Sequence, residues 1–405
     1  MITTYSNFAL MTTIHSGSNT RAMIPDLFNG LGAKRVVLFS DKGLLDAGIV
    51  DKVADIFRLT QNGTGAQLVG IFTDIQQDAG SESVNKAVRY AREMAADSVL
   101  AVGGGSVLDT VKGVKFALHH GLTDIKEAIP GGLAYFTWPE AQFIPIPHIS
   151  VPTTAGTGSE VSPIAVIYNE EKQVKTNIIH PFISSNMAVL DPELTTGLPP
   201  MITAFTGFDA LTHAIEALMS PTATGFTDAY ALQTIRLFEK NIVEVVKNGT
   251  NVKARMEMLQ ASTMGITAFS FALNAIPVHN LAHAYGALYR IPHGLANAVF
   301  LPHVIEMIPD LYLKKIDQLA QALGLEIAEK SPQSLLGEVV AKIRSLQEEV
   351  GLPKDFSAYD IPEDSLAKTI AAVQSDPAAM NFPLPTELLE AIAKRVAPVE
   401  APQTM

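Results

Sequence analysis

Asp209 and His213 are four residues apart, as are His279 and His283, and these two pairs indicate a metal site. A spacing of four places both members of a pair on one face of a helix. His293 follows ten residues after His283. One carboxylate with several imidazoles and no thiolate suits Fe²⁺, Zn²⁺, Mn²⁺ or Co²⁺, acting as a Lewis acid with an open coordination position.

The stretch 258–289, which holds His279 and His283, contains no Asp, Glu, Lys or Arg. Taken singly, a histidine is more often a satisfied core or surface residue than a metal ligand. Imidazoles buried in so apolar a stretch need partners, however, and a divalent ion supplies one. The motif HNLAH is not the zincin motif, because Asn280 replaces the glutamate that would act as base. His303 is predicted to lie at a helix end, with no stronger role.

A run of three glycines and a serine at 103–106 lies between a predicted strand and a predicted helix. Glycines let the backbone approach a ligand closely, and free N–H groups at a helix start attract a phosphate. Ser106 is predicted as the N-cap, with Asp109 completing a variant of the capping box. The run does not match the dinucleotide fingerprint G-x-G-x-x-G, because Leu108 occupies the position of the third glycine. A tight turn without a ligand therefore stays an alternative.

A second polar turn, VPTTAGTGSE at 151–160, is rich in hydroxyls and glycines. It suits hydrogen bonding to a ribose or pyrophosphate, although it could equally be an ordinary loop. Asp41 closes the first predicted strand. An acid at that position accepts hydrogen bonds from ribose hydroxyls and repels a 2′-phosphate, and a simple turn former is the alternative.

The elements that position these residues change in kind along the chain. Short apolar runs alternate with helix-like stretches in the first half, which predicts βαβ units and a parallel sheet. After the double proline at 199–200 only helices are predicted. We therefore expect an α/β dinucleotide-binding domain over residues 1–198 and an all-helical, metal-binding catalytic domain over 199–405. The predicted strands are 36–39, 68–72, 98–102, 165–168 and 188–190, and the predicted helices are 49–59, 83–96, 107–119, 201–219, 228–247 and 254–273.

Composition excludes several classes of protein. The 405 residues are 47% hydrophobic and 17% charged, which excludes a disordered chain. A net charge of −12 argues against a nucleic-acid partner. The absence of cysteine excludes disulfides, iron–sulfur clusters and thiolate zinc sites. The uncharged stretches 141–159 and 258–289 carry prolines and polar groups, and no signal peptide is recognised, so we expect a cytoplasmic protein without a membrane span.

Five motifs together resemble the iron-containing, or group III, alcohol dehydrogenases, in the family's order and over nearly the whole chain. They are GGGSVLD (103–109), VPTTAGTGSE (151–160), DPELTTGLP (191–199), GFDALTHAIEAL (207–218) and HNLAHAYGALYRIPHG (279–294). The resemblance implies a Rossmann-like parallel sheet domain followed by an all-α domain, a fold shared with glycerol dehydrogenase and dehydroquinate synthase.

The resemblance also implies a role for each matching residue. One divalent ion, Fe²⁺ before Zn²⁺, would be held by Asp209, His213, His279 and His293. His283 would lie beside the nicotinamide or ribose and relay the proton. NAD would be bound with its pyrophosphate on Gly104, Gly105 and Ser106, with Asp41 disfavouring NADP, and with further contacts from Asp109, Thr153, Thr154, Ser162, Lys175, Leu194 and Gly197. A homo-oligomer is also implied.

The chain departs from the family pattern at three places. Asp78-Ala79-Gly80 stands where the family often has Asn-Pro-Thr, and Asn381-Phe382-Pro383 stands for Asn-Pro-Arg. The segment 130–147, which contains Trp138, could border the mouth of the active site or merely cover the sheet. These departures indicate a distinct subgroup and leave the substrate open.

The expected reaction is the interconversion of a small primary alcohol or diol and its aldehyde by hydride transfer to or from NAD. The metal would lower the pKa of the hydroxyl group, and Phe269 and Phe271 would be pocket walls or core residues. The alternatives are polyol oxidation like that of glycerol dehydrogenase, a lyase like dehydroquinate synthase, and a structural metal protein.

Overall fold

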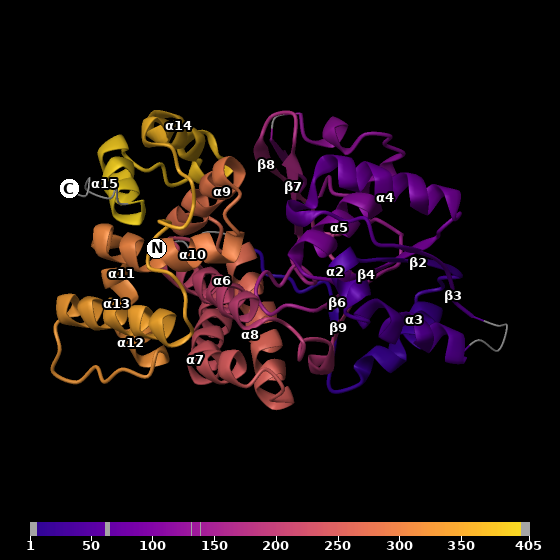
Figure 1. Ribbon diagram of the computed structural model, residues 1–405, viewed down its shortest axis with the longest axis horizontal. Helices are drawn as coiled ribbons and strands as arrows, with labels where there is room; N and C mark the ends of the chain where they lie inside the picture. Colours follow the sequence, from indigo (N-terminus) through magenta and orange to yellow (C-terminus); the bar gives the residue numbers. More distant parts are fainter. Residues whose placement is uncertain (1–5, 61–64, 131, 138, 398–405) are drawn as a thin grey trace, which may run out of the picture.

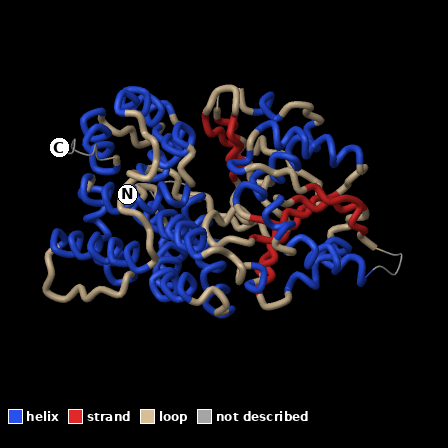
Figure 2. Tube along the Cα trace, viewed as in Figure 1, coloured by secondary structure: helices blue, strands red, loops and turns tan. Residues whose placement is uncertain are grey.

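A computed structural model describes residues 6–60, 65–130, 132–137 and 139–397. All strands of the described chain lie in one half of the molecule, and helices fill the other half (Figure 2). The chain passes from the α/β half to the helical half where α6 (Pro200–Met219) begins (Figure 1). This agrees with the change in pattern seen in the sequence, although the boundary at 198/199 stays a prediction.

Six parallel strands form the main sheet, in the order β1-β9-β6-β4-β2-β3. Their side chains alternate between two cores. Val37 and Val99 face α4 (Ser81–Glu93) and α5 (Gly105–His120), whereas Val36 and Leu100 face α1 (Ile24–Gly30) and α3 (Ile49–Thr60). The sheet therefore has helices on both faces. The predicted parallel sheet is confirmed. The strands are β1 (Thr13–Ser16), β2 (Arg35–Phe39), β3 (Gln67–Phe72), β4 (Ser98–Gly103), β6 (His148–Pro152) and β9 (Met187–Leu190).

The three helices predicted in this half, 49–59, 83–96 and 107–119, correspond to α3, α4 and α5 with small shifts at their ends, whereas α1 and α2 were not predicted. The helices of this half are α1 (Ile24–Gly30), α2 (Lys42–Asp46), α3 (Ile49–Thr60), α4 (Ser81–Glu93) and α5 (Gly105–His120), with short 3₁₀ turns η1 (Thr20–Met23), η2 (Gln77–Ala79), η3 (Ile125–Ala128) and η4 (Pro192–Leu194).

The predicted strand at 165–168 is confirmed, but it lies outside the main parallel sheet. It belongs to β7 (Ile164–Asn169), which pairs antiparallel with β8 (Val174–Ile179). With β5 (Leu133–Tyr135) these strands form a separate three-stranded sheet. The reason is the tight connection over residues 170–173, which turns the chain back on itself before it can return to the main sheet.

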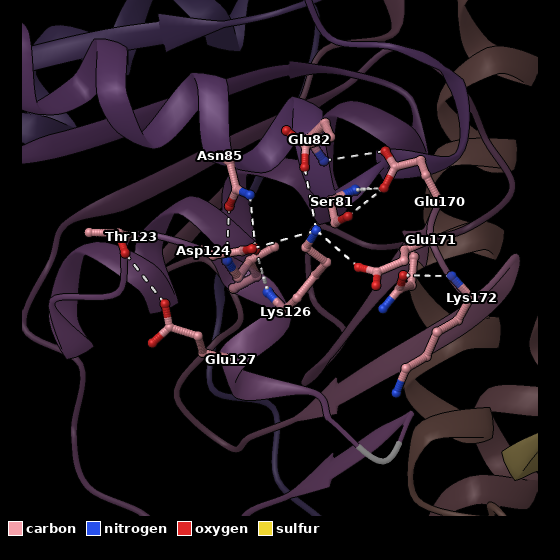
Figure 3. A network of polar contacts seen from close by, with 12 residues as sticks. Ser81, Glu82, Asn85, Thr123, Asp124, Lys126, Glu127, Glu170, Glu171 and Lys172 are labelled. Carbon is pink, nitrogen blue, oxygen red and sulfur yellow. Dashed lines mark hydrogen bonds and ion pairs between the residues drawn. The ribbon is translucent and has the colours of Figure 1, made fainter.

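This connection also ties the small sheet to the start of α4 (Figure 3). Glu170 accepts hydrogen bonds from the backbone N–H groups of Ser81 at 3.0 Å and Glu82 at 3.2 Å. It therefore satisfies helix N–H groups that no N-cap side chain satisfies. A Cβ at Gly80 would lie 2.2 Å from Glu170 Oε1, so a larger residue there would displace this carboxylate from the start of α4.

Lys126 holds the same surface together by its charge. Its Nζ lies 3.6 Å from Glu82, 3.5 Å from Asp124 and 3.5 Å from Glu171 (Figure 3). Three carboxylates around one ammonium raise the pKa of Lys126, with Asp124 as the largest cause. The network fixes the β7–β8 hairpin against α4 and η3.

The helical half is built on α6, α7 and α8, with the later helices packed around them (Figure 1). Its predicted helical character is confirmed, and residues 258–289 form the end of α8, the connection 271–276 and the whole of α9. No helix in the described part of the chain is long and apolar enough to cross a membrane. The helices are α6 (Pro200–Met219), α7 (Gly225–Lys247), α8 (Val252–Ser270), α9 (Pro277–Tyr289), α10 (His293–Met307), α11 (Pro309–Tyr312), α12 (Ile316–Ala322), α13 (Pro332–Glu349), α14 (Leu366–Ser375) and α15 (Thr386–Val396), with 3₁₀ turns η5 (Leu313–Lys315), η6 (Glu363–Ser365) and η7 (Pro377–Ala379).

The prediction that His303 marks a helix end is wrong, because α10 continues through Pro302 to Met307. Proline in a helix interior removes the hydrogen bond to the carbonyl four residues earlier, which here is that of Ala298. Gln347 Nε2 donates to this carbonyl instead. A side chain from α13 therefore replaces the missing donor, and the helix does not have to stop.

Candidate active site

One cavity of about 1500 Å³ lies between the two halves, and residues of both halves line it. The structure brings every site residue predicted from the sequence to this one cavity. Their individual roles stay predictions, because a shared location does not test them. The predicted residues that line it are Asp41, Gly104, Gly105, Ser106, Asp109, Thr153, Thr154, Ser162, Lys175, Leu194, Gly197, Asp209, His213, His279, His283 and His293.

A buried cluster of possible metal ligands lies at one end of the cavity. Asp209 and His213 come from α6 and His279 from α9, and one ligand atom of each lies within 4.8 Å of the other two. His293, the first residue of α10, is at the edge of this cluster, with its Nε2 atom 3.6 Å from Asp209 Oδ1. His279 Nε2 is 3.7 Å from the same oxygen.

The donor atoms of this cluster fit a divalent ion. Among the described residues, His279 Nε2 and His213 Nδ1 are buried and have no hydrogen-bond partner. Buried polar nitrogens without partners are costly, and a cation that accepts their lone pairs removes this cost. Carboxylate and imidazole donors without thiolates suit iron or zinc.

Two residues that support the cluster were not found from the sequence. Glu216, on α6, accepts a 2.6 Å hydrogen bond from the backbone N–H of Val278 and contacts His279 Nδ1. This contact turns the other ring nitrogen of His279 towards Asp209. Asn297 Nδ2 donates to Asp209 Oδ1 at 2.6 Å and lies 3.2 Å from His293 Nε2.

Glu216 carries a sequence signal that could have revealed it. It lies seven residues after Asp209, on the helix face that Asp209 and His213 define, within the quoted motif at 207–218. Asn297 lies four residues after His293 in the same way. Spacing alone would have placed both beside the ligands.

The electrostatics of the cluster favour a cation. Burial lowers the pKa of His279, but the charges of Glu216 and Asp209 outweigh it and raise that pKa to about 9. Burial alone raises the pKa of Asp209, whereas the neighbouring histidines bring it well below its usual value. Burial lowers the pKa of His213 to about 3, so this imidazole is neutral with a free lone pair. Two buried carboxylates thus stabilise positive charge, from a proton or from a metal ion.

His283 lies one turn further along α9, outside the buried trio. Its ring stacks on that of His293 with 5.3 Å between centroids. Its Nδ1 atom is 3.4 Å from Asp376 Oδ1, and Asp376 in turn caps η7 by accepting from the backbone N–H of Ala378 at 2.8 Å. The ring is therefore held between the cluster and a fixed carboxylate.

The glycine turn is placed as predicted, but the predicted cap is wrong. Helix α5 begins at Gly105 with Gly104 as its N-cap, and no side chain caps it. Ser106 is inside the helix, where its hydroxyl accepts from the backbone N–H of Asp78 at 3.1 Å. The turn is close to the second polar turn, since a Cβ at Gly105 would lie 2.6 Å from Thr157 Cγ2. Close packing of two turns is thus one reason for the glycines.

Asp109 does not complete a capping box either. Its Oδ1 atom accepts from Ser159 Oγ at 2.5 Å and lies 3.3 Å from Lys112 Nζ. It therefore connects the glycine turn of α5 to the second polar turn. Asp41 does cap a helix: it accepts from the backbone N–H of Leu44 at 2.9 Å at the start of α2, and it also lines the cavity.

The three departures from the family pattern also reach the cavity. Asp78 lines it and pairs with Lys175 at 3.3 Å, and Asn381 lines it from the helical half. Tyr135 and Phe136, from the segment 130–147, line the cavity. Of the two predicted places for this segment, the mouth of the active site is therefore favoured over a position that only covers the sheet. Trp138 lies outside the described residues.

Comparison with known families identifies the chain. Residues 11–192 match the family model described as iron-containing alcohol dehydrogenase, and residues 203–392 match that of the Fe-containing alcohol dehydrogenase family, C-terminal. The chain belongs to the iron-containing alcohol dehydrogenase family. As a member it is an oxidoreductase that interconverts alcohols and aldehydes with NAD and a divalent metal ion.

Individual relatives agree with this assignment. The chain is 36% identical to long-chain-alcohol dehydrogenase 1 of Geobacillus thermodenitrificans over 384 residues, which cover 91% of this chain and 90% of that protein. It is 35% identical to 1,3-propanediol dehydrogenase of Klebsiella pneumoniae over 350 residues, 86% and 87% of the two chains. The crystal structure of a 1,3-propanediol oxidoreductase superposes with a TM-score of 0.89 at 31% identity, covering 97% of this chain and 100% of the other.

Proposed function

We propose that this alcohol dehydrogenase holds one divalent ion on Asp209, His213, His279 and His293, with Fe²⁺ preferred to Zn²⁺. The observation that carries this proposal is the buried cluster with its unpartnered imidazole nitrogens. The ion, when bound, supplies a Lewis acid that lowers the pKa of the alcohol hydroxyl. Glu216 orients the His279 ring for this task.

The cofactor NAD occupies the α/β side of the cavity. Gly104, Gly105 and Ser106 lie at the start of α5, where helix N–H groups bind a pyrophosphate. Asp41 lies after β2, where its carboxylate accepts from the ribose hydroxyls and repels the 2′-phosphate of NADP. The remaining contacts come from the residues already named on that side of the cavity: Asp109, Thr153, Thr154, Ser162, Lys175, Leu194 and Gly197.

His283 accepts the proton that leaves the alcohol hydroxyl. Its ring lies next to His293 at the edge of the metal cluster, and Asp376 stabilises the protonated imidazole from the other side. Asp376 is itself fixed by the backbone of η7, so the imidazole keeps one orientation.

The substrate is an uncharged alcohol, a primary alcohol or a diol, and not the acidic substrate of a lyase. Among the described residues that line the cavity after Asp209, none is Asp, Glu, Lys or Arg. A substrate with carboxylates or phosphates would lose hydration there without gaining a counter-charge. The same absence of charge does not exclude a polyol, so oxidation like that of glycerol dehydrogenase stays the second candidate.

Formation of NADH from ethanol, 1-butanol, 1,2-propanediol and glycerol tests the function. The protein is first stripped of metal with a chelator and then refilled with Fe²⁺ or Zn²⁺. We expect turnover only with metal, and none in His279→Ala. If NAD and metal bind but no alcohol is oxidised and no aldehyde reduced, the alcohol dehydrogenase assignment of the site is wrong.

The cytoplasmic location, the homo-oligomer and zinc as second metal stay predictions. Size-exclusion chromatography with light scattering tests the homo-oligomer, and metal analysis of the protein as purified tests the preference for iron.

A further inference from the structure

The cavity is larger than a single small-molecule site, and its two sides differ in chemistry. A volume of about 1500 Å³ exceeds the roughly 300–1,000 Å³ of most ligand pockets, so it accommodates a dinucleotide and a second molecule. The charged side chains that line it, including Asp41, Asp78 and Lys175, belong to residues up to Asp209. The later lining residues in the described chain are apolar, uncharged polar or histidine.

The uncharged side begins at the metal cluster with an aromatic ring. Phe269 is only 7% exposed, and its ring centroid lies 4.9 Å from that of His213 and 4.6 Å from that of His279. A substrate carbon held beside these ligands therefore meets a phenyl ring. Phe271, Leu273 and Ile276 follow on the same segment and line the cavity as well.

The N-terminal arm, residues 6–11, packs on this side of the cavity and connects it to the α/β half. It leads into β1 of the main sheet, whereas the Phe8 ring packs on the helical half, 5.3 Å from Phe226, 5.6 Å from Tyr230 and 5.1 Å from Phe271. On either side of Phe8, Asn7 and Ala9 line the cavity. Phe8 thus anchors a strap that spans the two halves, without lining the cavity itself.

We propose that the alcohol pocket is built for an unbranched aliphatic primary alcohol longer than three carbons, whose tail runs from Phe269 past Phe271 under the N-terminal arm. Phe8 is a positioning residue that holds this wall in place. This inference rests on the proposed function and goes further by naming the substrate class.

One polar group on this side favours a different substrate. The hydroxyl of Ser270 is buried without a hydrogen-bond partner in the described structure, and the residue lines the cavity. A second hydroxyl, such as that of 1,3-propanediol, would satisfy it. Ser270 lies between two phenylalanines in the sequence, however, and a diol would lose water along Phe271, Leu273 and Ile276 without gaining a hydrogen-bond partner from them.

The first test is a chain-length series with metal-loaded enzyme and NAD: 1-propanol, 1-butanol, 1-hexanol, 1,3-propanediol and glycerol. Each methylene that the pocket buries fully raises kcat/KM by about fourfold, the equivalent of about 0.8 kcal/mol. We expect kcat/KM to rise at least tenfold from 1-propanol to 1-hexanol. A binding measurement accompanies it: hexanamide, which cannot react, should bind the NADH complex at least tenfold more tightly than acetamide.

The second test removes the anchor of the arm. Phe8→Ala should raise KM for 1-hexanol at least fivefold, with kcat and the binding of NADH nearly unchanged and with little effect on 1-propanol. The matched control is Phe143→Ala, since Phe143, like Phe8, packs on another phenylalanine outside the cavity lining, although it is more exposed. It should leave all substrates unaffected.

Three results would overturn the inference. Higher kcat/KM for 1,3-propanediol or glycerol than for 1-hexanol, lost in Ser270→Ala, would make the pocket a diol site. Equal effects of Phe8→Ala on 1-propanol and 1-hexanol would show that the arm is not part of the tail wall. Absence of turnover with every alcohol and aldehyde, despite bound NAD and metal, would instead refute the proposed function on which the inference depends.

Discussion

Replacing Glu216 by glutamine tests whether the metal cluster depends on a carboxylate that does not belong to it. Glu216 is fully buried on α6 and accepts from two donors, the backbone N–H of Val278 and the Nδ1–H of His279. Glutamine has nearly the same shape, but it has one acceptor oxygen and an NH₂ group. Glu216→Gln therefore leaves one N–H facing another donor and removes the negative charge that orients His279.

The magnitude follows from these contacts. Hydrogen bonds to charged groups contribute about 1.5–3 kcal/mol, and the loss of a partner behind a metal-binding histidine weakens metal affinity by roughly 10- to 100-fold. We therefore expect the dissociation constant for Zn²⁺ to rise by about 10- to 100-fold in Glu216→Gln. Because Val278 loses part of its contact, the metal-free protein should be less stable by about 1–3 kcal/mol.

The assay is a competition titration of the metal-free protein against a chromophoric chelator, with circular dichroism to show that the fold is intact. Glu257→Gln is the matched control, since Glu257 also accepts hydrogen bonds in the helical half, from Lys240 at 2.7 Å and Asn241 at 2.8 Å, and neither partner is a predicted metal ligand. If Glu216→Gln binds zinc within twofold of the original protein, Glu216 does not tune the site and the reasoning is wrong.

Three further changes test other contacts. In Asp41→Gly, the loss of the carboxylate should lower the ratio of kcat/KM for NAD to that for NADP at least tenfold. Stability should change little, because glycine is tolerated at an N-cap. An unchanged ratio in steady-state kinetics would contradict this prediction. Lys115 is buried, and burial followed by the charge of Lys112 lowers its pKa to about 7. Above pH 7 the unfolded chain keeps this proton and the folded chain releases it, so the free energy of unfolding should rise with pH. Measured by urea unfolding, the rise from pH 7 to pH 9 should be about 2 kcal/mol larger in the original protein than in Lys115→Met. An equal rise in both proteins would refute this prediction. Gly158 has φ +57°, and a Cβ there would lie 2.3 Å from Ile266 Cγ2. Gly158→Ala should therefore lower the free energy of unfolding, measured with urea, by more than about 2 kcal/mol. Gly337→Ala, at a helix position with no atom near the added Cβ, is the control and should not lower it.

The main sheet could be predicted because its strands carry their own signal. β2 and β4 are continuous apolar runs, as strands buried on both faces must be. The run in β7 looks the same locally, yet its partner is β8. A strand's own residues do not specify which edge it pairs with, so the antiparallel hairpin could not be separated from the sheet.

Elements with mixed signals were missed for a different reason. β6 begins with His148 and ends with Pro152, residues that are unusual in a central strand. His148 is nevertheless completely buried, and Ser150 supplies a 3.1 Å hydrogen-bond partner to its Nε2 atom. Likewise, α10 continues past His303 because Gln347 donates to the carbonyl of Ala298, which Pro302 leaves without a backbone donor. Both compensations come from residues whose contacts only the folded chain reveals.

The spacing of the histidines on α9 links sequence, structure and chemistry most directly. His279 and His283 are one turn apart, with 6.3 Å between their ring centroids. The first ring is buried against Glu216, whereas the second lies nearer the open cavity with 12% of its side chain exposed. A histidine that binds a metal must stay fixed and carry no proton on its ligating nitrogen, whereas a proton carrier must gain and release one. The sequence could place both rings on one helix face, but the different tasks that we propose for them rest on the carboxylates that they contact, Glu216 and Asp376.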